Sequence, residues 1–546
     1  MMLVSSFVAL VQLGIALASP LASPTISLDT ATVIGTSSGQ VSKFLGIPYA
    51  QPPTGNRRFR PPEPIAPYTG SVDATKYGTA CPQQRDQVPD ELPASGIFDI
   101  LVNIVETAAV PDSEDCLKIN VIKPANIAAN SQLPVLVWIF GGAFESGSPS
   151  RNDGTSIVER SLELNEPVIY VSMDYRSNGF GFLASQEVKD AGVGNLGLRD
   201  QREALRWVQK YISAFGGDPK KVTIWGESAG AISTALHMVT NNGDTEGLFR
   251  AAFMQSGSTI PVGDITNGQK YYDQIVADTG CSGSSDTLDC LRQVPYDKLK
   301  DAINNTPGVF SYQALHLTWV PRIDGSFLTD SPLRLAQQGK VANIPFVSGN
   351  CDDEGTVFSL FSLNVTTDPD ARGYLKNVLL PPGVPETDLD DIMRVYPQDI
   401  TQGSPYDTSI LNAPTPQFKR LSSIQGDAVF QMPRRLLLQS LSGRQNAWSF
   451  LSKRFKAFPF VGSAHGTDLL NVYGGGELTN YLIHFTSNLN PNGNSVAQWP
   501  QYTPDSPNLL TLQPEISVLT PVVVTQDTYR TEAMDVFRRV LLDHPL

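Results

Sequence analysis

The stretch Val222-Thr-Ile-Trp-Gly-Glu-Ser-Ala-Gly230 decides the fold. Its first four residues form a short apolar run, which predicts a buried strand, and the small residues after Ser228 permit a helix. A sharp turn must then join strand and helix at Ser228. Gly226 and Gly230 leave room for strained backbone angles there, and the turn directs the hydroxyl toward the helix N-terminus, where N–H groups favour negative charge. We therefore expect Ser228 to be a nucleophile.

The bare pattern Gly-x-Ser-x-Gly is not specific, because Gly35-Thr-Ser-Ser-Gly39 matches it as well. That copy lies between two strand-like runs, residues 32–34 and 41–45, and is typical of a hairpin turn. The strand–turn–helix context of Ser228, and not the pattern itself, selects the nucleophile.

Further apolar runs without polar alternation surround the Ser228 segment. They are Pro134–Phe140, Pro167–Met173, Ala251–Met254 and Pro345–Ser348. A helical pattern covers residues 198–215 between two of them. Buried runs separated by helices predict an α/β fold with a large, mostly parallel central sheet covered by helices on both faces. In such sheets, functional sites form at the carboxyl ends of the strands.

A glycine-rich turn, Gly141-Gly142-Ala143, follows the run Pro134–Phe140. It could be an ordinary turn. Its place upstream of the serine favours a loop whose backbone N–H groups bind an oxyanion, with Ala229 as a further donor.

A serine nucleophile needs a base. His237 lies in the small-residue segment directly after Ser228, and four histidines lie further along the chain: His316, His465, His484 and His544. His544 is near the chain end, while His316 and His484 have bulky apolar neighbours. His465 lies in the small-residue loop Gly462-Ser-Ala-His-Gly466, which suits a base that must reach a nucleophile. For the acid, Asp352, Asp353 and Glu354 follow the run Pro345–Ser348. The residues alone do not choose among them, and a solvated acidic loop is the ordinary alternative.

Composition restricts the partners and the compartment. The chain has 546 residues and a formal net charge of −14, so nucleic acid is not an expected partner. Residues 1–18 are apolar and end in Ala16-Leu-Ala18, which predicts a cleaved export signal; a membrane anchor or a disordered tail is the alternative. No other stretch suggests an integral membrane span. Residues 19–546 are expected to form one catalytic domain, and the protein is expected to be extracellular.

Five cysteines fit an exported protein. Cys281 and Cys290 suit a short disulfide loop, and Cys81 with Cys116 would close a longer one, although the sequence alone permits other pairings. Cys351 is then left as a buried thiol. Two sequons predict glycosylation, at Asn304 and Asn364.

Taken together, these motifs resemble the type-B carboxylesterase/lipase family, which includes the cholinesterases, and among its members the secreted fungal lipases and sterol esterases. The motifs are Phe44-Leu-Gly-Ile-Pro-Tyr-Ala50, Glu114-Asp-Cys-Leu-Lys-Ile-Asn120, Gly141-Gly-Ala-Phe144, Asn195-Leu-Gly-Leu198, Phe215-Gly-Gly-Asp-Pro219 and Gly226-Glu-Ser-Ala-Gly230.

The resemblance implies an α/β-hydrolase fold and assigns roles residue by residue. The catalytic residues would be Ser228, Glu354 and His465; the oxyanion donors Gly142, Ala143 and Ala229; the second-shell positions Glu227, Ser256 and Asp468; and the disulfides Cys81–Cys116 and Cys281–Cys290. Position 143 holds alanine where relatives also have glycine, which could narrow the alcohols accepted. The family requires no cofactor, and the sequence has no His/Cys cluster with metal spacing.

The loop 81–116 would carry the lid found in lipases of this family. Apolar residues between Ile97 and Ala108 fall on one helical face, which could cover an apolar pocket in water and open at a lipid–water interface; a plain surface helix is the alternative. The loop has no Trp or Tyr, which argues against choline esters.

We therefore expect a secreted hydrolase of hydrophobic carboxylic esters, similar to triacylglycerol lipases. A sterol esterase or general carboxylesterase is the first alternative, and a non-catalytic cholinesterase-like binding protein is a more remote one. The sequence does not indicate an oligomeric state.

Overall fold

The computed structural model describes residues 23–85, 110–128, 130–517 and 519–546. The expected export signal at 1–18 and the expected apolar helix face at 97–108 lie outside the described residues. Within the described ranges, no helix is both long and apolar enough to cross a bilayer.

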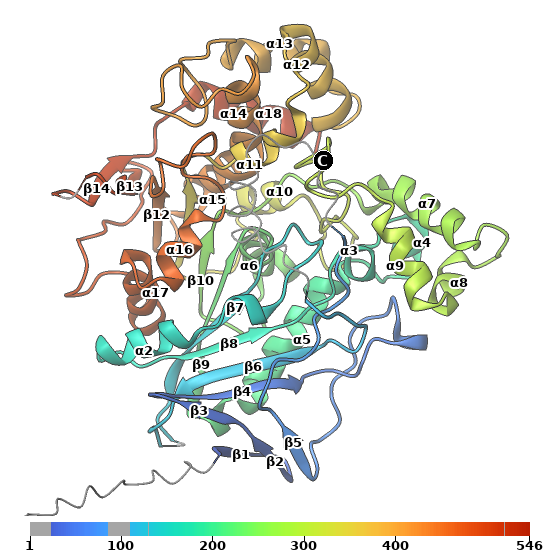
Figure 1. The fold of residues 1–546 in the computed structure, drawn as a ribbon, viewed down its shortest axis with the longest axis vertical. Helices are drawn as coiled ribbons and strands as arrows, with labels where there is room; N and C mark the ends of the chain where they lie inside the picture. The colour runs from blue at the N-terminus through green and yellow to red at the C-terminus, as the bar shows by residue number, and fades with distance from the viewer. Residues whose placement is uncertain (1–22, 86–109, 129, 518) are drawn as a thin grey trace, which may run out of the picture.

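A large twisted sheet passes through the molecule (Figure 1). In spatial order its strands are β14 (Val522–Gln526), β13 (Asn508–Leu512), β12 (Ala447–Ser452), β11 (Phe346–Cys351), β10 (Ala251–Gln255), β9 (Gly217–Glu227), β7 (Leu133–Ile139), β8 (Ile169–Met173), β6 (Lys118–Pro124), β4 (Val41–Pro48) and β3 (Thr36–Ser38). Neighbours from β13 to β8 run parallel, and the strands at both edges run antiparallel. The prediction of a large, mostly parallel sheet is confirmed.

The central strands form where the sequence has uninterrupted apolar runs. Every residue of β8, β10 and β11 is buried, as expected for strands covered on both faces. The runs that begin at Pro134, Pro167, Ala251 and Pro345 therefore give β7, β8, β10 and β11.

The expected hairpin around Gly35-Thr-Ser-Ser-Gly39 is wrong in one respect. Residues 36–38 are not a turn but the edge strand β3, which pairs with β4. The preceding strand β2 (Ala31–Ile34) joins β1 (Thr25–Leu28) and β5 (Ser71–Asp73) in a separate small sheet. The chain changes sheet at Gly35, where a Cβ would lie 2.3 Å from the carbonyl oxygen of Lys43, so only glycine fits.

Helices cover both faces of the large sheet (Figure 1). One group packs α2 (Thr155–Glu163), α16 (Thr467–Tyr473) and α17 (Glu477–Asn488) together, and another packs α6 (Ala229–Val239), α10 (Pro332–Gln337) and α15 (Met432–Leu441). The helix expected from residue 198 is α5 (Leu196–Tyr211), and the small helices α3 (Asn178–Phe182) and α4 (Gln186–Asp190) precede it.

Two further groups of helices extend from the sheet. The helices α7 (Gln269–Thr279), α8 (Thr287–Gln293) and α9 (Tyr296–Asn304) lie at the right of Figure 1. At its top lie α12 (Asp368–Tyr374), α13 (Glu386–Val395), α14 (Phe418–Gly426) and α18 (Thr531–Asp543). These upper helices, with α11 (Thr356–Ser359), form a second apolar core beside that of the sheet. Residues that follow β7 and β11, such as Ala143 and Val357, pack in this second core.

Candidate active site

Ser228 occupies the sharp turn that the sequence predicts. It stands between the end of β9 and the start of α6, with φ of 53° and ψ of −125°. A non-glycine residue pays an energetic cost at such a positive φ, and it persists only where the surroundings fix it. They do so here, because a Cβ on Gly230 would lie 1.9 Å from the carbonyl oxygen of Ile139. The two chain segments therefore touch backbone to backbone, which only glycine allows.

A line of hydrogen bonds runs from Ser228 through His465 to Glu354. The Ser228 Oγ and His465 Nε2 atoms are 2.8 Å apart, and His465 Nδ1 lies 2.6 Å from Glu354 Oε2. His465 and Glu354 are both buried. The structure thus brings together, within hydrogen-bonding distance, the three residues that the resemblance singled out. Such an arrangement can take a proton from a serine hydroxyl and stabilise the resulting imidazolium.

The three adjacent carboxylates after β11 have different environments. Glu354 alone reaches the histidine, and its Oε1 accepts hydrogen bonds from the backbone of Cys351 and the side chain of Asn350. Asp352 and Asp353 turn to Lys456, whose Nζ lies 2.6 Å and 2.7 Å from their carboxylates. The loop is therefore not a solvated acidic turn; all three carboxylates are buried.

The side chain of Asp353 ties three loops together. Its Oδ1 accepts hydrogen bonds from the Ser404 hydroxyl and the Tyr406 backbone, and its Oδ2 accepts one from the backbone of Ser463. Burial raises the pKa of this carboxyl, and the Lys456 ammonium opposes that effect. From the sequence, Asp353 was one of three candidates for the catalytic acid. In the structure its hydrogen bonds instead fix the loop that carries His465.

The glycine-rich loop after β7 packs against the serine. A Cβ on Gly141 would lie 3.0 Å from the Cβ of Ser228. Gly142 has a φ of 93°, and Ala143 follows with a φ of 56°. Ala229 is the first residue of α6, at the N-terminal end where backbone N–H groups point out of the helix. The predicted oxyanion donors, Gly142, Ala143 and Ala229, thus belong to two segments that border Ser228.

The three further residues that the resemblance singled out, Glu227, Ser256 and Asp468, lie near this line of hydrogen bonds. Glu227 Oε1 is 3.5 Å from His465 Nε2. Ser256 Oγ is 3.9 Å from the Sγ of the buried Cys351. Asp468 is fully buried, and this burial raises its pKa to about 6.

Gln255 links both halves of the site, and the sequence analysis missed it. Its backbone carbonyl accepts the N–H of Ser228 at 2.9 Å, and its side-chain amide donates to Asp468 Oδ2 at 2.8 Å. Asp468 stands three residues after His465, in the first turn of α16. Gln255 therefore holds the serine turn and the helix behind the histidine at once. No local pattern marks it, because it is the last residue of an ordinary buried strand.

Two aromatic rings enclose the histidine. The centroids of Phe358 and Phe430 lie 5.3 Å and 4.6 Å from that of His465. They were also missed, since an isolated phenylalanine in a helix gives no signal beyond burial. Both restrict the imidazole to the orientation in which it faces Ser228.

The other histidines have separate roles. His237 contacts Gln201, and His484 lies between Glu166 and Ser495. His316 lies near the carbonyl oxygen of Leu379, and burial lowers its pKa to about 4. His544 is partly exposed near the end of the chain.

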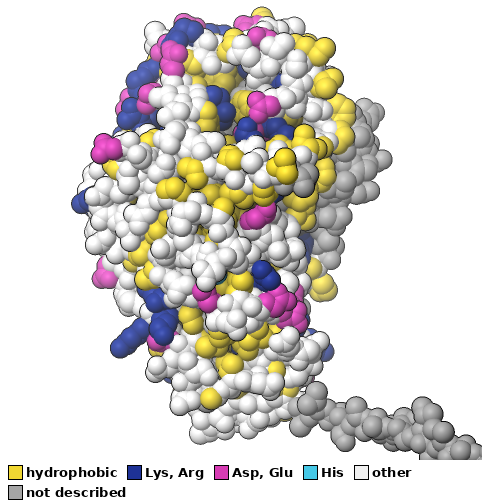
Figure 2. Space-filling model, turned by 90° about the vertical axis from the view of Figure 1, so that its left-hand side faces the viewer, with side chains coloured by type: hydrophobic (Ala, Val, Ile, Leu, Met, Phe, Trp, Pro, Cys, Tyr) yellow, Lys and Arg dark blue, Asp and Glu magenta, His cyan; other side chains and the backbone are white. Residues whose placement is uncertain are grey.

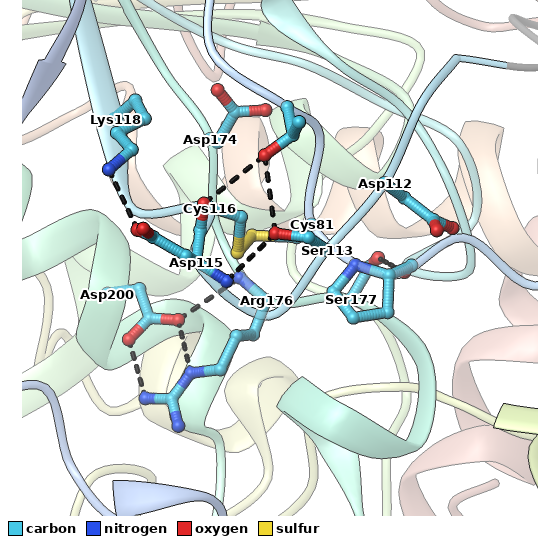
Figure 3. Close-up of a disulfide and its surroundings, with 12 residues drawn as sticks. Cys81, Asp112, Ser113, Asp115, Cys116, Lys118, Asp174, Arg176, Ser177 and Asp200 are labelled. Carbon is cyan, nitrogen blue, oxygen red and sulfur yellow. Dashed lines mark hydrogen bonds and ion pairs between the residues drawn. A yellow bond between two sulfur atoms is a disulfide. The ribbon is translucent and has the colours of Figure 1, made fainter. Parts of the chain in front are cut away.

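The cysteines pair as the resemblance implies. Disulfides join Cys81 to Cys116 and Cys281 to Cys290, and Cys351 is free and buried. Figure 3 shows the first disulfide beside the ion pair of Arg176 and Asp200, which fixes the neighbouring chain with two bonds of 2.7 Å.

The two sequons differ in accessibility. Asn364 is exposed. Asn304 is only 9% exposed, and its side-chain oxygen accepts a hydrogen bond from the backbone of Arg85.

Comparison with known proteins agrees with this arrangement. The carboxylesterase family model matches residues 22–537. Lipase 2 of Diutina rugosa is 43% identical over 91% of this chain and 92% of its own length. A protein named secreted lipase 1, from Botryotinia fuckeliana, is 41% identical over 88% of both chains. The crystal structure of EstA from Aspergillus niger superposes with a TM-score of 0.81 and 27% identity, covering 96% of this chain and 99% of that one. The chain belongs to the carboxylesterase family and is a carboxylic ester hydrolase of the α/β-hydrolase fold.

Proposed function

We propose that the protein is a secreted, triacylglycerol lipase-like hydrolase that works through an acyl-enzyme on Ser228. The observation that carries this proposal is the unbroken line of short contacts from Ser228 through His465 to Glu354. Ser228 Oγ attacks the ester carbonyl while His465 Nε2 takes its proton. Glu354 holds the imidazole in the required tautomer and stabilises its charged form.

The oxyanion of the tetrahedral intermediate is bound by the backbone N–H groups of Gly142, Ala143 and Ala229. His465 then returns the proton to the departing alcohol, and water cleaves the acyl-enzyme by the same route in reverse. Glu227, beside His465 Nε2, would favour the imidazolium that forms during both steps.

A narrow apolar crevice beside α6 supports a hydrophobic substrate. Ile232 lies one turn after Ser228 on α6 and lines this crevice together with Val429, which adjoins the ring of Phe430 against the histidine. Its other lining residues are almost all apolar: Ile260, Pro261, Val262, Leu315, Leu317, Val320 and Leu546, with His316 and Arg322. Contact with this lining would remove apolar surface of the acyl group from water, which favours binding of a hydrophobic substrate.

The relatives support both the substrate and the export. A protein of Gibberella zeae named secreted triacylglycerol lipase LIP1 is 40% identical over 88% of this chain. We propose that residues 1–18 are an export signal, that residues 19–546 form the mature catalytic domain, and that the substrate is presented at a lipid–water interface.

Hydrolysis of a trioleoylglycerol emulsion beside a soluble short-chain ester tests the proposal. Ser228→Ala should abolish both activities, with kcat lower by at least about 10⁴-fold, and Glu354→Gln should lower kcat by about 10⁴-fold. Ser37→Ala is the matched control, because Ser37 lies in the second Gly-x-Ser-x-Gly pattern, in the edge strand β3, where its hydroxyl is 3.1 Å from that of Ser42.

Each outcome decides one element of the proposal. Full activity of Ser228→Ala would refute the mechanism. If the wild-type protein cleaves only the soluble ester, the protein is a general carboxylesterase, and preference for a cholesteryl ester over the triglyceride would make it a sterol esterase.

A further inference from the structure

Two neighbouring loops expose apolar side chains beside the active site. We define them together as the apolar rim, residues 409–413 and 457–460. Ile410 and Leu411 are 64% and 66% exposed, although leucine and isoleucine are usually buried. Phe458 and Phe460 are half-buried in the second loop, so part of each ring remains open to solvent. Exposed apolar groups gathered in one place mark an interaction surface.

The apolar rim is fastened to the segments that carry the histidine and the acid. The side-chain oxygen of Asn412 accepts the backbone N–H of Phe460 at 3.0 Å, which joins the two loops, and His465 follows five residues later. On the other side, the backbone N–H of Tyr406 donates to Asp353 at 2.8 Å, and Asp353 directly precedes Glu354. The rim is therefore not a remote loop but the outer part of the loops that build the site.

The apolar rim presents almost no charge. The sequence has no Asp, Glu, Lys or Arg from Thr408 to Phe418, and none from Ala457 to Thr467. The lysines beside the rim turn inward. Lys456 faces Asp352 and Asp353, and the buried Lys419 donates to the Thr408 hydroxyl and the Ser409 carbonyl. At the border of the rim, Lys453 and Asp407 form an ion pair of 2.9 Å.

A third segment extends the same side of the molecule. Ile516 is 88% exposed in the turn after β13, and the carboxylate of Glu515 accepts the backbone N–H of Phe455 at 2.7 Å. Figure 2 shows the side of the molecule that lies at the left of Figure 1, where β13 and β14 are, and several patches of hydrophobic side chains lie on it.

We propose that the apolar rim docks the protein on an uncharged lipid surface and so brings the active site to its substrate. This inference rests on the proposed function and adds the surface that makes the contact. The uncharged character of the rim suits a neutral lipid, while the formal net charge of −14 disfavours an anionic membrane. Burial of Ile410 and Leu411 in lipid removes their apolar surface from water, which drives the docking.

Flotation with a trioleoylglycerol emulsion, using full-length protein that carries Ser228→Ala so that the lipid is not consumed, tests the docking. In this background, Ile410→Ser with Leu411→Ser should raise the lipid concentration for half-maximal binding by about tenfold or more. The matched control is Tyr312→Ser, which removes a ring that is 42% exposed and packs on Tyr374 instead. The control should bind the emulsion like its parent.

Activity separates this inference from the proposed function. In the otherwise wild-type protein, the double variant should hydrolyse the soluble short ester at an unchanged rate and the emulsion about tenfold more slowly at low lipid.

Unchanged emulsion binding by the double variant would overturn the docking proposal, even where the wild type cleaves the emulsion. Stronger binding to phosphatidylserine vesicles than to the emulsion would also overturn it. So would a dimer that the double substitution dissociates while emulsion binding stays the same. A wild-type protein that binds the emulsion without hydrolysing it would refute the proposed function and leave the docking surface supported.

Discussion

The carboxylate of Asp353 accepts the backbone N–H of Ser463 at 2.9 Å, so the residue before the proposed acid holds the loop of the proposed base. The four donors to this carboxylate come from two other segments of the chain: Ser404 and Tyr406 from one, Lys456 and Ser463 from the other. The hydrogen bonds of the Asp353 carboxylate go to these four donors, and Ser228 and His465 are not among them. Its effect on the reaction must therefore pass through the position of the histidine loop.

Asp353→Asn should lower kcat for a soluble ester by roughly 10- to 100-fold with little change in KM, because an amide nitrogen would face two of the four donors and shift the loop. Stopped-flow or steady-state kinetics on a soluble ester measure both constants. Asp407→Asn, at an ion pair whose carboxylate is 69% exposed, should leave kcat unchanged. A kcat for Asp353→Asn equal to that of the wild type would show that the loop holds its position without the carboxylate.

Asp468 should make the stability of the protein depend on pH. Burial raises its pKa from 3.8 to about 6, so between these values the folded state binds a proton that the unfolded state has lost. Stability contributed by the protonated form is complete below pH 3.8 and is lost as pH rises toward 6.

Asp468→Asn removes this loss, so it should stabilise the protein at pH 7.5 by up to about 3 kcal/mol relative to its effect at pH 4. Urea unfolding at the two pH values measures the difference. An equal effect at both values would mean that the folded-state pKa of Asp468 is not raised.

Gly230→Ala should lower the free energy of unfolding by about 2 kcal/mol or more, because the new Cβ would overlap the carbonyl oxygen of Ile139. Gly283→Ala is a suitable control, since no atom lies within 4 Å of the added Cβ there. Chemical denaturation of both variants checks the prediction, and equal midpoints would contradict it.

Glycosylation should occur at Asn364 and not at Asn304. Thr306, the threonine of the Asn304 sequon, is fully buried and donates its hydroxyl to the carbonyl of Ile303. This burial leaves no room for the transferase or the glycan. Glycopeptide mass spectrometry of protein secreted from a eukaryotic host checks this, with Asn364→Gln expected to remove the whole glycan mass. Glycan on the peptide that contains Asn304 would show that modification precedes folding of that segment.

The parts of the molecule that could be predicted from sequence are those in which a local pattern has one physical solution. The turn at Ser228 is such a case, because strand, glycine spacing and helix are all encoded within nine residues. The choice of Glu354 as the acid is not encoded locally. Asp352 and Asp353 are engaged by Lys456, which lies about a hundred residues further along the chain. From the residues alone all three carboxylates remained open, and only the family resemblance selected one.

Gln255 and the rings around His465 could not be found for a related reason. A glutamine at the end of a buried strand and a phenylalanine in a helix satisfy ordinary rules of burial wherever they occur. Their relation to the site exists only after the sheet has brought β9, β10 and α16 together. The edge strand at residues 36–38 could not be predicted either. It forms by pairing with β4, whereas its own composition is typical of a turn.

The double attachment of Gln255 has a mechanical consequence. Its carbonyl carries the serine turn and its side chain, through Asp468, carries the helix that follows the histidine. A thermal displacement of the end of β10 therefore moves nucleophile and base in the same direction. Because both residues are attached to the same strand end, the distance between the Ser228 hydroxyl and the His465 imidazole changes less than the position of either group.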